Sequence, residues 1–449
     1  MSNRDDEEGR RIAAKLRAGQ STAPVGIRRE AIMDAPAFTA ATRRMGAGDL
    51  QGAADIAASL IERYPGHPEA RFTLAMCGYW HCEQSPEAAR TAAAMLEQVV
   101  ADRPGFAIAW YNLGFLRQRQ GLDAEAIRHY NRSLDLDPTL VGAHVNLGNA
   151  RLWEGNIPEA LACFARATRY PTTDTLAIYN RAIAHLLTGQ WAKGWADYEQ
   201  RWASPLFRAK FRSPDLPIWD GTPAPDKRLL VFSEQGFGDT LMTYRYAEQL
   251  AGLFPAGVTW YVQEKLACLL GAVPDTEPYP EADLAVPTMS LMHRLGMPTH
   301  GGAYLPLYGE TVPGRVGYVW AGSESHENDA RRSTDPGLWA PLREVPGWEW
   351  VDLQVGRGGS FTPADWRDTA RAVSQCALVV TVDTAVAHLA GALGVPVWIL
   401  LPAMPDYRWG LESERTVWYD SARLFRQPSV GEWPAVFEQV RRALEEWPA

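Results

Sequence analysis

Residues 378–402 read LVVTVDTAVAHLAGALGVPVWILLP, and this stretch decides the fold of the second half of the chain. An apolar run is followed by Asp383 and Thr384, an alanine-rich helical pattern, Gly394 and a second apolar run. Apolar runs without alternation are typical of strands that are buried on both faces of a parallel sheet. Parallel strands need a crossover between them, usually a helix. The stretch therefore predicts a strand, a crossover helix and a second, parallel strand.

Asp383 and Thr384 lie at the predicted junction between the first strand and the helix. In open α/β sheets ligands bind outside the carboxyl ends of the strands, and the N-terminus of a helix attracts phosphate. The junction is thus a candidate anion site. An ordinary Asp/Thr cap on a buried crossover explains the same residues as well, so both interpretations stay open.

The composition is that of a globular protein with room for two or three domains of about 150 residues. Hydrophobic residues make up 46% and charged residues 22% of the 449 residues, and the net charge is −9. This charge argues against general affinity for nucleic-acid backbones or anionic membranes. No apolar run approaches the roughly 20 residues of a membrane span, and the charged N-terminus does not resemble a secretory signal. We expect a cytoplasmic protein with no nucleic-acid partner and no membrane span.

The cysteines indicate reduced thiols rather than disulfides or a metal site. They are odd in number and scattered along the chain, at Cys77, Cys82, Cys163, Cys268 and Cys376. His81 lies between the first two, but no second pair of ligands follows at the spacing of a zinc site. We therefore expect a reducing compartment and no bound metal.

Residues 37–202 have a helical pattern that repeats every 34 residues. The matching pairs are Ala109 and Ala143, Leu113 and Leu147, Gly114 and Gly148, Gly121 and Gly155, Ala126 and Ala160, Tyr130 and Phe164, Asn146 and Asn180, and Gly155 and Gly189. This spacing resembles the tetratricopeptide repeat. The small residues would let the two helices of a hairpin approach closely, and the aromatic residues would fill the space between hairpins.

Two repeats are clear, and we expect degenerate ones at residues 70–103 and 175–202 and a further hairpin at 37–68. Atypical terminal repeats are usual in a solenoid. The concave face of such a stack is commonly a peptide or protein site. A purely structural support for the following domain is the alternative.

After residue 226 the pattern changes to apolar runs that alternate with helical segments, which predicts parallel sheets in two Rossmann-like lobes. Expected strands before the opening stretch cover 228–234, 257–263, 282–286, 314–322 and 348–353, and a last one covers 423–427. Expected helices cover 240–253, 265–273, 289–295, 363–376 and 433–446. The segments are a poorly ordered N-terminus (1–33), a repeat domain (34–202), a linker with five prolines (203–226), a short first lobe (227–313) and a second lobe (314–449).

A glycine turn, Gly236-Phe-Gly238-Asp239, joins the first strand of the first lobe to its helix. Glycines let the backbone approach a ligand closely, although Leu241 replaces the third glycine of the dinucleotide fingerprint. Asp239 would be ionised at the helix N-terminus, where it is a candidate general base. The alternative is that Asp239 only caps the helix.

The loop at residues 320–333, WAGSESHENDARRS, follows the first strand of the second lobe. Its two adjacent arginines, Arg331 and Arg332, suit a diphosphate, because arginine binds phosphate oxygens with paired hydrogen bonds. The alternative is an ordinary solvated loop.

Three pieces occur in a characteristic order: residues 234–250, residues 316–333, and residues 379–402 followed by DYRWG at 406–410. Together they resemble the glycosyltransferases related to bacterial lipopolysaccharide heptosyltransferases, in the branch with N-terminal tetratricopeptide repeats. The resemblance covers residues 228–449 and the repeats. It implies a GT-B fold after the α-solenoid, with a nucleotide-sugar donor held mainly by the second lobe, inversion at the anomeric carbon and no metal.

The resemblance assigns roles to particular residues. Asp239 matches the aspartate that deprotonates the acceptor hydroxyl, after the turn of Gly236 and Gly238. The residues that match donor-binding positions are Ser323, Arg332, Asp383, Thr384, Ala385 and His388. The first lobe is shorter than in the heptosyltransferases, and the Asp329-Ala-Arg-Arg-Ser run leaves the choice between Arg331 and Arg332 open.

We expect a metal-independent, inverting glycosyltransferase whose repeats recruit the acceptor, a protein or peptide in preference to a lipid-linked glycan. The alternative from another class is a repeat scaffold with a degenerate, non-catalytic transferase domain. A nucleotide-sugar hydrolase or epimerase is a third and less favoured interpretation, since a repeat solenoid has no obvious task in such an enzyme. The sugar, its nucleotide and the acceptor atom do not follow from the sequence.

Overall fold

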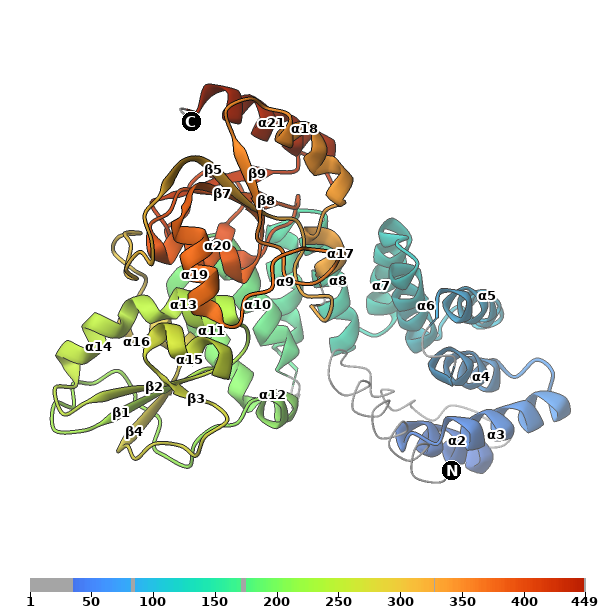
Figure 1. Ribbon diagram of the computed structural model, residues 1–449. Helices are drawn as coiled ribbons and strands as arrows, with labels where there is room; N and C mark the ends of the chain where they lie inside the picture. The colour runs from blue at the N-terminus through green and yellow to red at the C-terminus, as the bar shows by residue number, and fades with distance from the viewer. Residues whose placement is uncertain (1–34, 82–84, 171–174, 327, 448–449) are drawn as a thin grey trace, which may run out of the picture. The chain divides into compact units, whose positions relative to one another are not determined.

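The computed structural model describes residues 35–81, 85–170, 175–326 and 328–447 (Figure 1). The N-terminal segment 1–33, which we predict to be poorly ordered, lies outside these residues. The described chain forms two compact units. Of the described residues, the first unit holds those up to 184 together with 200–206, and the second holds 185–199 and those from 207 onward.

The first unit consists of helices that pack in consecutive pairs. Its helices are α2 (Ala35–Gly46), α3 (Leu50–Arg63), α4 (Pro68–His81), α5 (Pro86–Asp102), α6 (Ala107–Arg119), α7 (Asp123–Leu136), α8 (Val141–Trp153) and α9 (Ile157–Ala167). Helix α10 (Leu176–Leu187) passes from the first unit into the second, and α11 (Trp191–Tyr198) belongs wholly to the second. Helices α2 and α3 cover the hairpin expected at 37–68, and α4 and α5 cover the degenerate repeat expected at 70–103.

Glycines at the 34-residue spacing have the structural roles that the repeat requires. A Cβ atom on Gly114 would lie 2.8 Å from the Tyr130 ring, and one on Gly148 would lie 2.5 Å from the Phe164 ring. Only glycine therefore lets α6 approach α7, and α8 approach α9, this closely. Gly121 has a φ angle of 76° and ends the turn between α6 and α7, where a side chain would be strained.

The second unit contains two parallel sheets, and the first has the strand order β3-β2-β1-β4. Its strands are β1 (Leu229–Phe232), β2 (Val258–Val262), β3 (Val273–Pro274) and β4 (Leu284–Pro287). The helices between them are α13 (Phe237–Thr243), α14 (Ala247–Leu253), α15 (Glu264–Leu270) and α16 (Leu291–Leu295). Three of the strands were predicted, whereas the two residues of β3 are too few for a periodicity to be seen.

The second sheet has the order β6-β5-β7-β8-β9, and all its neighbouring strands are parallel. Figure 1 labels β5, β7, β8 and β9 of this sheet. Its strands are β5 (Val312–Val319), β6 (Glu349–Asp352), β7 (Cys376–Val382), β8 (Val397–Leu401) and β9 (Ala422–Arg426). Helices α19 (Trp366–Ser374) and α20 (Ala385–Leu393) pack near β7, while α18 (Ala340–Arg343) and α21 (Trp433–Glu446) share a core with other side chains of the sheet. The predicted crossover β7-α20-β8 is confirmed.

The proline-rich segment that we predict to be a linker is partly structured. It contains the short helix α12 (Pro205–Lys210). Further on, Ile218 forms a parallel bridge to Ala285 of β4, and Trp219 is buried against Phe254. This part of the segment therefore packs against the first sheet of the second unit.

Within the described ranges, no helix combines the length and the apolar character that a membrane crossing requires. The same residues contain no group of three or more His, Cys, Asp or Glu side chains arranged to hold a metal ion. Four cysteines lie in the described chain as free thiols, Cys77, Cys163, Cys268 and Cys376.

Candidate functional site

The carboxyl ends of β1 and β7 lead into α13 and α20, and these two helices pack against each other. Their contact depends on Gly238, because a Cβ atom there would lie 2.7 Å from Cδ2 of His388. The sequence predicts that Gly238 lets the backbone approach a ligand closely, and in this structure the close approach is between α13 and α20. The glycine turn and the Asp383 junction, which are far apart in the sequence, are brought to one place.

His388 is a buried packing residue in this contact. Its ring stacks on Trp409 at a centroid distance of 5.2 Å, and its Nδ1 lies 2.9 Å from the hydroxyl of Tyr419. Burial lowers the pKa of His388 well below its usual value, and the charges of Arg408 and Arg245 lower it further. The imidazole is therefore neutral and holds α20 in position.

Asp239 lies at the third position of α13 and both of its carboxylate oxygens are engaged. Oδ2 accepts a hydrogen bond of 2.9 Å from the backbone N–H of Gly236, so Asp239 does cap the helix. Oδ1 forms an ion pair with Arg408. The side chain of Asp239 is 13% exposed.

Arg408 is a site residue that local sequence reasoning did not single out. Its guanidinium contacts Asp239 and, through Nη1 at 2.6 Å, Asp406, and it lies 4.4 Å from the ring centroid of Tyr407. These carboxylates raise the pKa of Arg408 even though burial opposes its charge. In the sequence, DYRWG at 406–410 enters only through the resemblance, and its Asp406 and Arg408 are the available signal of a charged pair.

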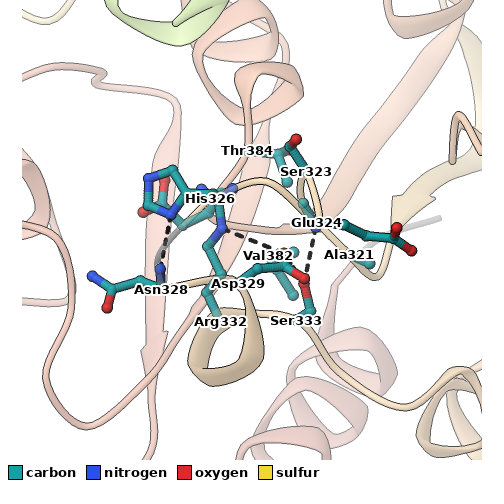
Figure 2. Close-up of polar contacts among 12 residues, drawn as sticks. Ala321, Ser323, Glu324, His326, Asn328, Asp329, Arg332, Ser333, Val382 and Thr384 are labelled. Carbon is teal, nitrogen blue, oxygen red and sulfur yellow. Dashed lines mark hydrogen bonds and ion pairs between the residues drawn. The ribbon is translucent and has the colours of Figure 1, made fainter. Parts of the chain in front are cut away.

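Arg332 lies at the junction of β7 and α20. Its Nη1 donates a hydrogen bond of 3.0 Å to the backbone carbonyl of Asp383. Its buried Nε makes no hydrogen bond among the described residues but lies 3.9 Å from Oδ1 of Asp329, with which it forms an ion pair (Figure 2). Gly322 makes room for it, since a Cβ atom there would lie 2.5 Å from the guanidinium. The neighbouring Arg331 is exposed. Of the two arginines, the structure thus places Arg332 at the predicted anion site.

Asp383 carries an unusual carboxyl group. Burial, and then the nearby charge of Asp406, raise the pKa of Asp383 to about 6, although Arg332 and Arg408 act in the opposite direction. Its neighbour Thr384 is the N-cap residue of α20, but the Thr384 side chain makes no capping hydrogen bond and lies 3.1 Å from the hydroxyl of Thr381. The simple Asp/Thr cap is therefore not what these two residues form.

Ser323 lies on the exposed loop between β5 and the short helix α17 (Asp329–Arg332; Figure 2). Its hydroxyl lies 2.9 Å from that of Ser325. The base of the loop is fixed by Ser333, which accepts from the backbone N–H of Gly322 at 3.0 Å and donates to Asp329 at 2.7 Å. Ser323 itself is exposed to solvent and takes no part in the hydrogen bonds that fix the base of the loop.

Arg357 is a second basic residue that sequence reasoning missed. It follows β6, has a φ angle of 53°, and donates through Nη1 to Asp329 at 2.8 Å. The surrounding glycines, in VGRGGS at 355–360, were the available signal of an unusual turn. Arg357 thus ties the turn after β6 to the loop that carries Arg332.

The predicted residues fall into two neighbouring groups. Arg332, Asp383, Thr384 and the start of α20 at Ala385 surround the carboxyl end of β7. Asp239 and its turn form the second group, and Arg408 joins it to the loop after β8. This arrangement can hold an anion on one side and an ionised carboxylate on the other.

Comparison with known proteins supports the repeats. A model of the tetratricopeptide repeat family matches residues 107–140, which cover α6, α7 and the turn that follows. The helical part of the chain therefore contains tetratricopeptide repeats, and the prediction from the 34-residue spacing is confirmed.

A curated relative extends over most of the chain. Protein FlbA of Caulobacter vibrioides (strain ATCC 19089 / CIP 103742 / CB 15) is 27% identical over 418 residues, covering 79% of this chain and 70% of FlbA. The alignment is too long to be confined to the repeats. The name FlbA states no activity.

Similar solved structures match only part of the chain. MamA is 18% identical, with a TM-score of 0.32, over 38% of this chain and 97% of MamA. PilW, a type IV pilus biogenesis factor, is 21% identical, with a TM-score of 0.34, over 38% of this chain and 79% of PilW. A thermophilic tetratricopeptide-repeat protein of Thermus thermophilus is 20% identical, with a TM-score of 0.30, over 33% of this chain and 80% of its own. Structural similarity at these low TM-scores does not indicate a function.

Proposed function

We propose that this protein is a nucleotide-sugar-dependent glycosyltransferase of the GT-B type that inverts the anomeric carbon without a metal, and whose repeats recruit a protein acceptor. The observation that carries the proposal is the position of Arg332. Its guanidinium lies at the junction of β7 and α20, with an Nε that makes no hydrogen bond and is 3.9 Å from Asp329, beside an Asp383 carboxyl group with a raised pKa. Strongly perturbed groups of this kind cluster at functional sites.

The diphosphate of the donor would bind between Arg332 and the N-terminus of α20. Arginine offers paired N–H donors, and the N-terminal amides of a helix carry partial positive charge. Together they can stabilise the negative charge that develops on a departing diphosphate. Because the pKa of Asp383 is about 6, its carboxyl group can donate a hydrogen bond to a sugar hydroxyl when protonated and accept one when ionised.

The reaction would use Asp239 as the base. The acceptor oxygen attacks the anomeric carbon, the bond from that carbon to the diphosphate oxygen breaks, and the diphosphate leaves with the electron pair. The acceptor proton passes to Asp239. A carboxylate has about four acceptor positions, so the contacts with Gly236 and Arg408 leave positions for the acceptor hydroxyl.

A specific observation favours the second candidate, a scaffold that binds a nucleotide without turning it over. The cap to Gly236 and the ion pair to Arg408 give Asp239 a structural role that needs no chemistry. The repeats themselves suggest a surface for protein partners in either case. Turnover, rather than binding, therefore separates the two candidates.

Binding is tested by thermal shift of the full chain with nucleoside diphosphates and nucleotide-sugars. A ligand at 100 times its dissociation constant adds roughly 2.7 kcal/mol, which raises the melting temperature by several degrees. We expect one nucleotide family to shift the wild type and Arg332→Ala to abolish the shift. Arg315→Ala is the matched control, because Arg315 lies near the opposite end of β5 and pairs with Glu349 at 3.1 Å. Absence of any shift, or equal loss in both variants, contradicts the donor site.

A further inference from the structure

The turn that carries Asp239 contains a residue in an unfavourable backbone conformation. Gln235, between β1 and α13, has a φ angle of 76°, which lies in the left-handed region that favours glycine. The next residue along the chain is Gly236. Strained residues of this kind persist only where surrounding contacts fix them, and they cluster at functional sites.

The side chain of Gln235 makes a contact that glycine could not make. Its Nε2 donates a hydrogen bond of 2.7 Å to the hydroxyl of Tyr198 on α11. Its backbone carbonyl accepts a hydrogen bond of 3.2 Å from Gln263, after β2. The strained turn is therefore fixed from two sides, and one of these is helix α11.

Tyr198 also contacts the loop that provides Arg408. Its ring is buried, at 1% exposure, with its centroid 5.4 Å from that of Trp195 and 6.1 Å from that of Tyr407. Tyr407 precedes Arg408, and Arg408 pairs with Asp239. These contacts form a closed circuit that runs through Tyr198, Gln235, Gly236, Asp239, Arg408 and Tyr407 and back to Tyr198.

We infer that Tyr198 is a positioning residue for the base Asp239, and that α11 is thus part of the catalytic unit. The hydroxyl of Tyr198 holds Gln235 in its left-handed conformation, and this sets the direction in which Gly236 and α13 present the Asp239 carboxylate. The inference rests on the proposed function for the catalytic consequence only. The holding of the turn by Tyr198 is measurable in the absence of any substrate.

The test uses the full chain with Tyr198→Phe, which removes one hydroxyl and keeps the ring contacts. Tyr261→Phe is the matched control, because the Tyr261 hydroxyl lies 2.9 and 2.7 Å from the carbonyl oxygens of Asp275 and Glu277, to either of which it can donate its proton, at the β3 edge of the first sheet. Hydrogen exchange followed by mass spectrometry reports on peptides that cover residues 233–243. A hydrogen bond contributes about the energy of a tenfold change in an equilibrium.

We expect Tyr198→Phe to accelerate exchange in residues 233–243 by about tenfold and Tyr261→Phe to leave it unchanged. In a Gln235→Gly background the turn no longer needs the hydrogen bond. In that background Tyr198→Phe is expected to change the exchange rate of residues 233–243 only slightly, whereas a general loss of packing would accelerate exchange in both backgrounds. Unchanged exchange in Tyr198→Phe, or an equal effect in both backgrounds, overturns the inference.

The catalytic consequence is measured with the nucleotide-sugar that the thermal-shift screen selects. Tyr198→Phe is expected to lower kcat about tenfold and to leave KM for the donor unchanged, because the donor contacts lie at Arg332 and α20. A normal kcat together with faster exchange refutes a positioning role. If the wild type shows no turnover, the proposed function fails, and the exchange measurement alone decides whether Tyr198 holds the turn.

Discussion

Replacing Arg408 with glutamine is expected to destabilise the second unit strongly. Arg408 is in contact with two carboxylates, Asp239 and Asp406, and its side chain is only 10% exposed. Removing one partner of a buried pair costs about 3–5 kcal/mol, because it leaves a charge without its counter-ion. Asp239 and Asp406 are 13% and 29% exposed, so we take the lower end, about 3 kcal/mol.

Removing Asp239 should destabilise the protein less than removing Arg408, because Arg408 has a second carboxylate partner. Asp239→Asn leaves Arg408 with Asp406, and an asparagine oxygen can still accept from Gly236, so the loss should be about 1 kcal/mol. Arg408→Gln leaves both carboxylates without their cation. The two single variants should therefore differ clearly, and the double variant should lose less than their sum.

The assay is thermal unfolding of the full chain followed by calorimetry. About 3 kcal/mol corresponds to a decrease of roughly 6–12 °C for a unit of this size. Arg371→Gln is the matched control, since Arg371 pairs with Asp368 at 3.1 Å on the surface, where both side chains are exposed. Such a pair contributes at most about 1 kcal/mol. Equal melting temperatures for the Arg408 and Arg371 variants would refute the reasoning.

Three further predictions concern the same unit. The pKa of Asp383 is raised to about 6, so ionisation of this carboxyl group opposes folding, and the free energy of unfolding should fall as the pH rises from about 4 to about 6. Asp383→Asn should therefore melt above the wild type at pH 7 but not at pH 4, and a difference independent of pH would count against this. Gly238→Ala should cost about 1–3 kcal/mol through overpacking against α20, whereas the exposed Gly252→Ala, which has open space around it, should not destabilise in denaturant titration; equal effects would contradict the close contact. A truncated chain that begins at residue 185 should unfold cooperatively, whereas one that begins after α11 should not, because the loss of buried Trp195 alone costs about 3–5 kcal/mol; similar calorimetric transitions for both would disprove the role of α11.

The parts of the fold that follow a simple period were predictable from the sequence. The apolar runs on either side of Asp383 gave β7, α20 and β8, and the amphipathic pattern of residues 433–446 gave α21 with its observed bounds. The repeats followed from glycines such as Gly114 and Gly148, because each is required by an aromatic neighbour on the next helix. In these cases the reason for each residue lies within one turn or one hairpin.

The features that were missed depend on contacts between distant residues. Arg408 meets Asp239 from 169 positions away, and no local pattern indicates that pairing. The left-handed conformation of Gln235 is compensated by Tyr198, which lies in another element. Helix α12 was missed for another reason, because the proline content of residues 203–226 favoured a linker although residues 205–210 form a helix.

The proposed reaction is tested most directly by the release of nucleoside diphosphate from the nucleotide-sugar that binds the protein. The wild type should consume this donor, faster with an acceptor present. Asp239→Asn should still bind it but turn over about 10²- to 10⁴-fold more slowly, as expected for the loss of a general base. Binding without consumption by the wild type, or an unchanged rate in Asp239→Asn, would contradict the account and favour the scaffold.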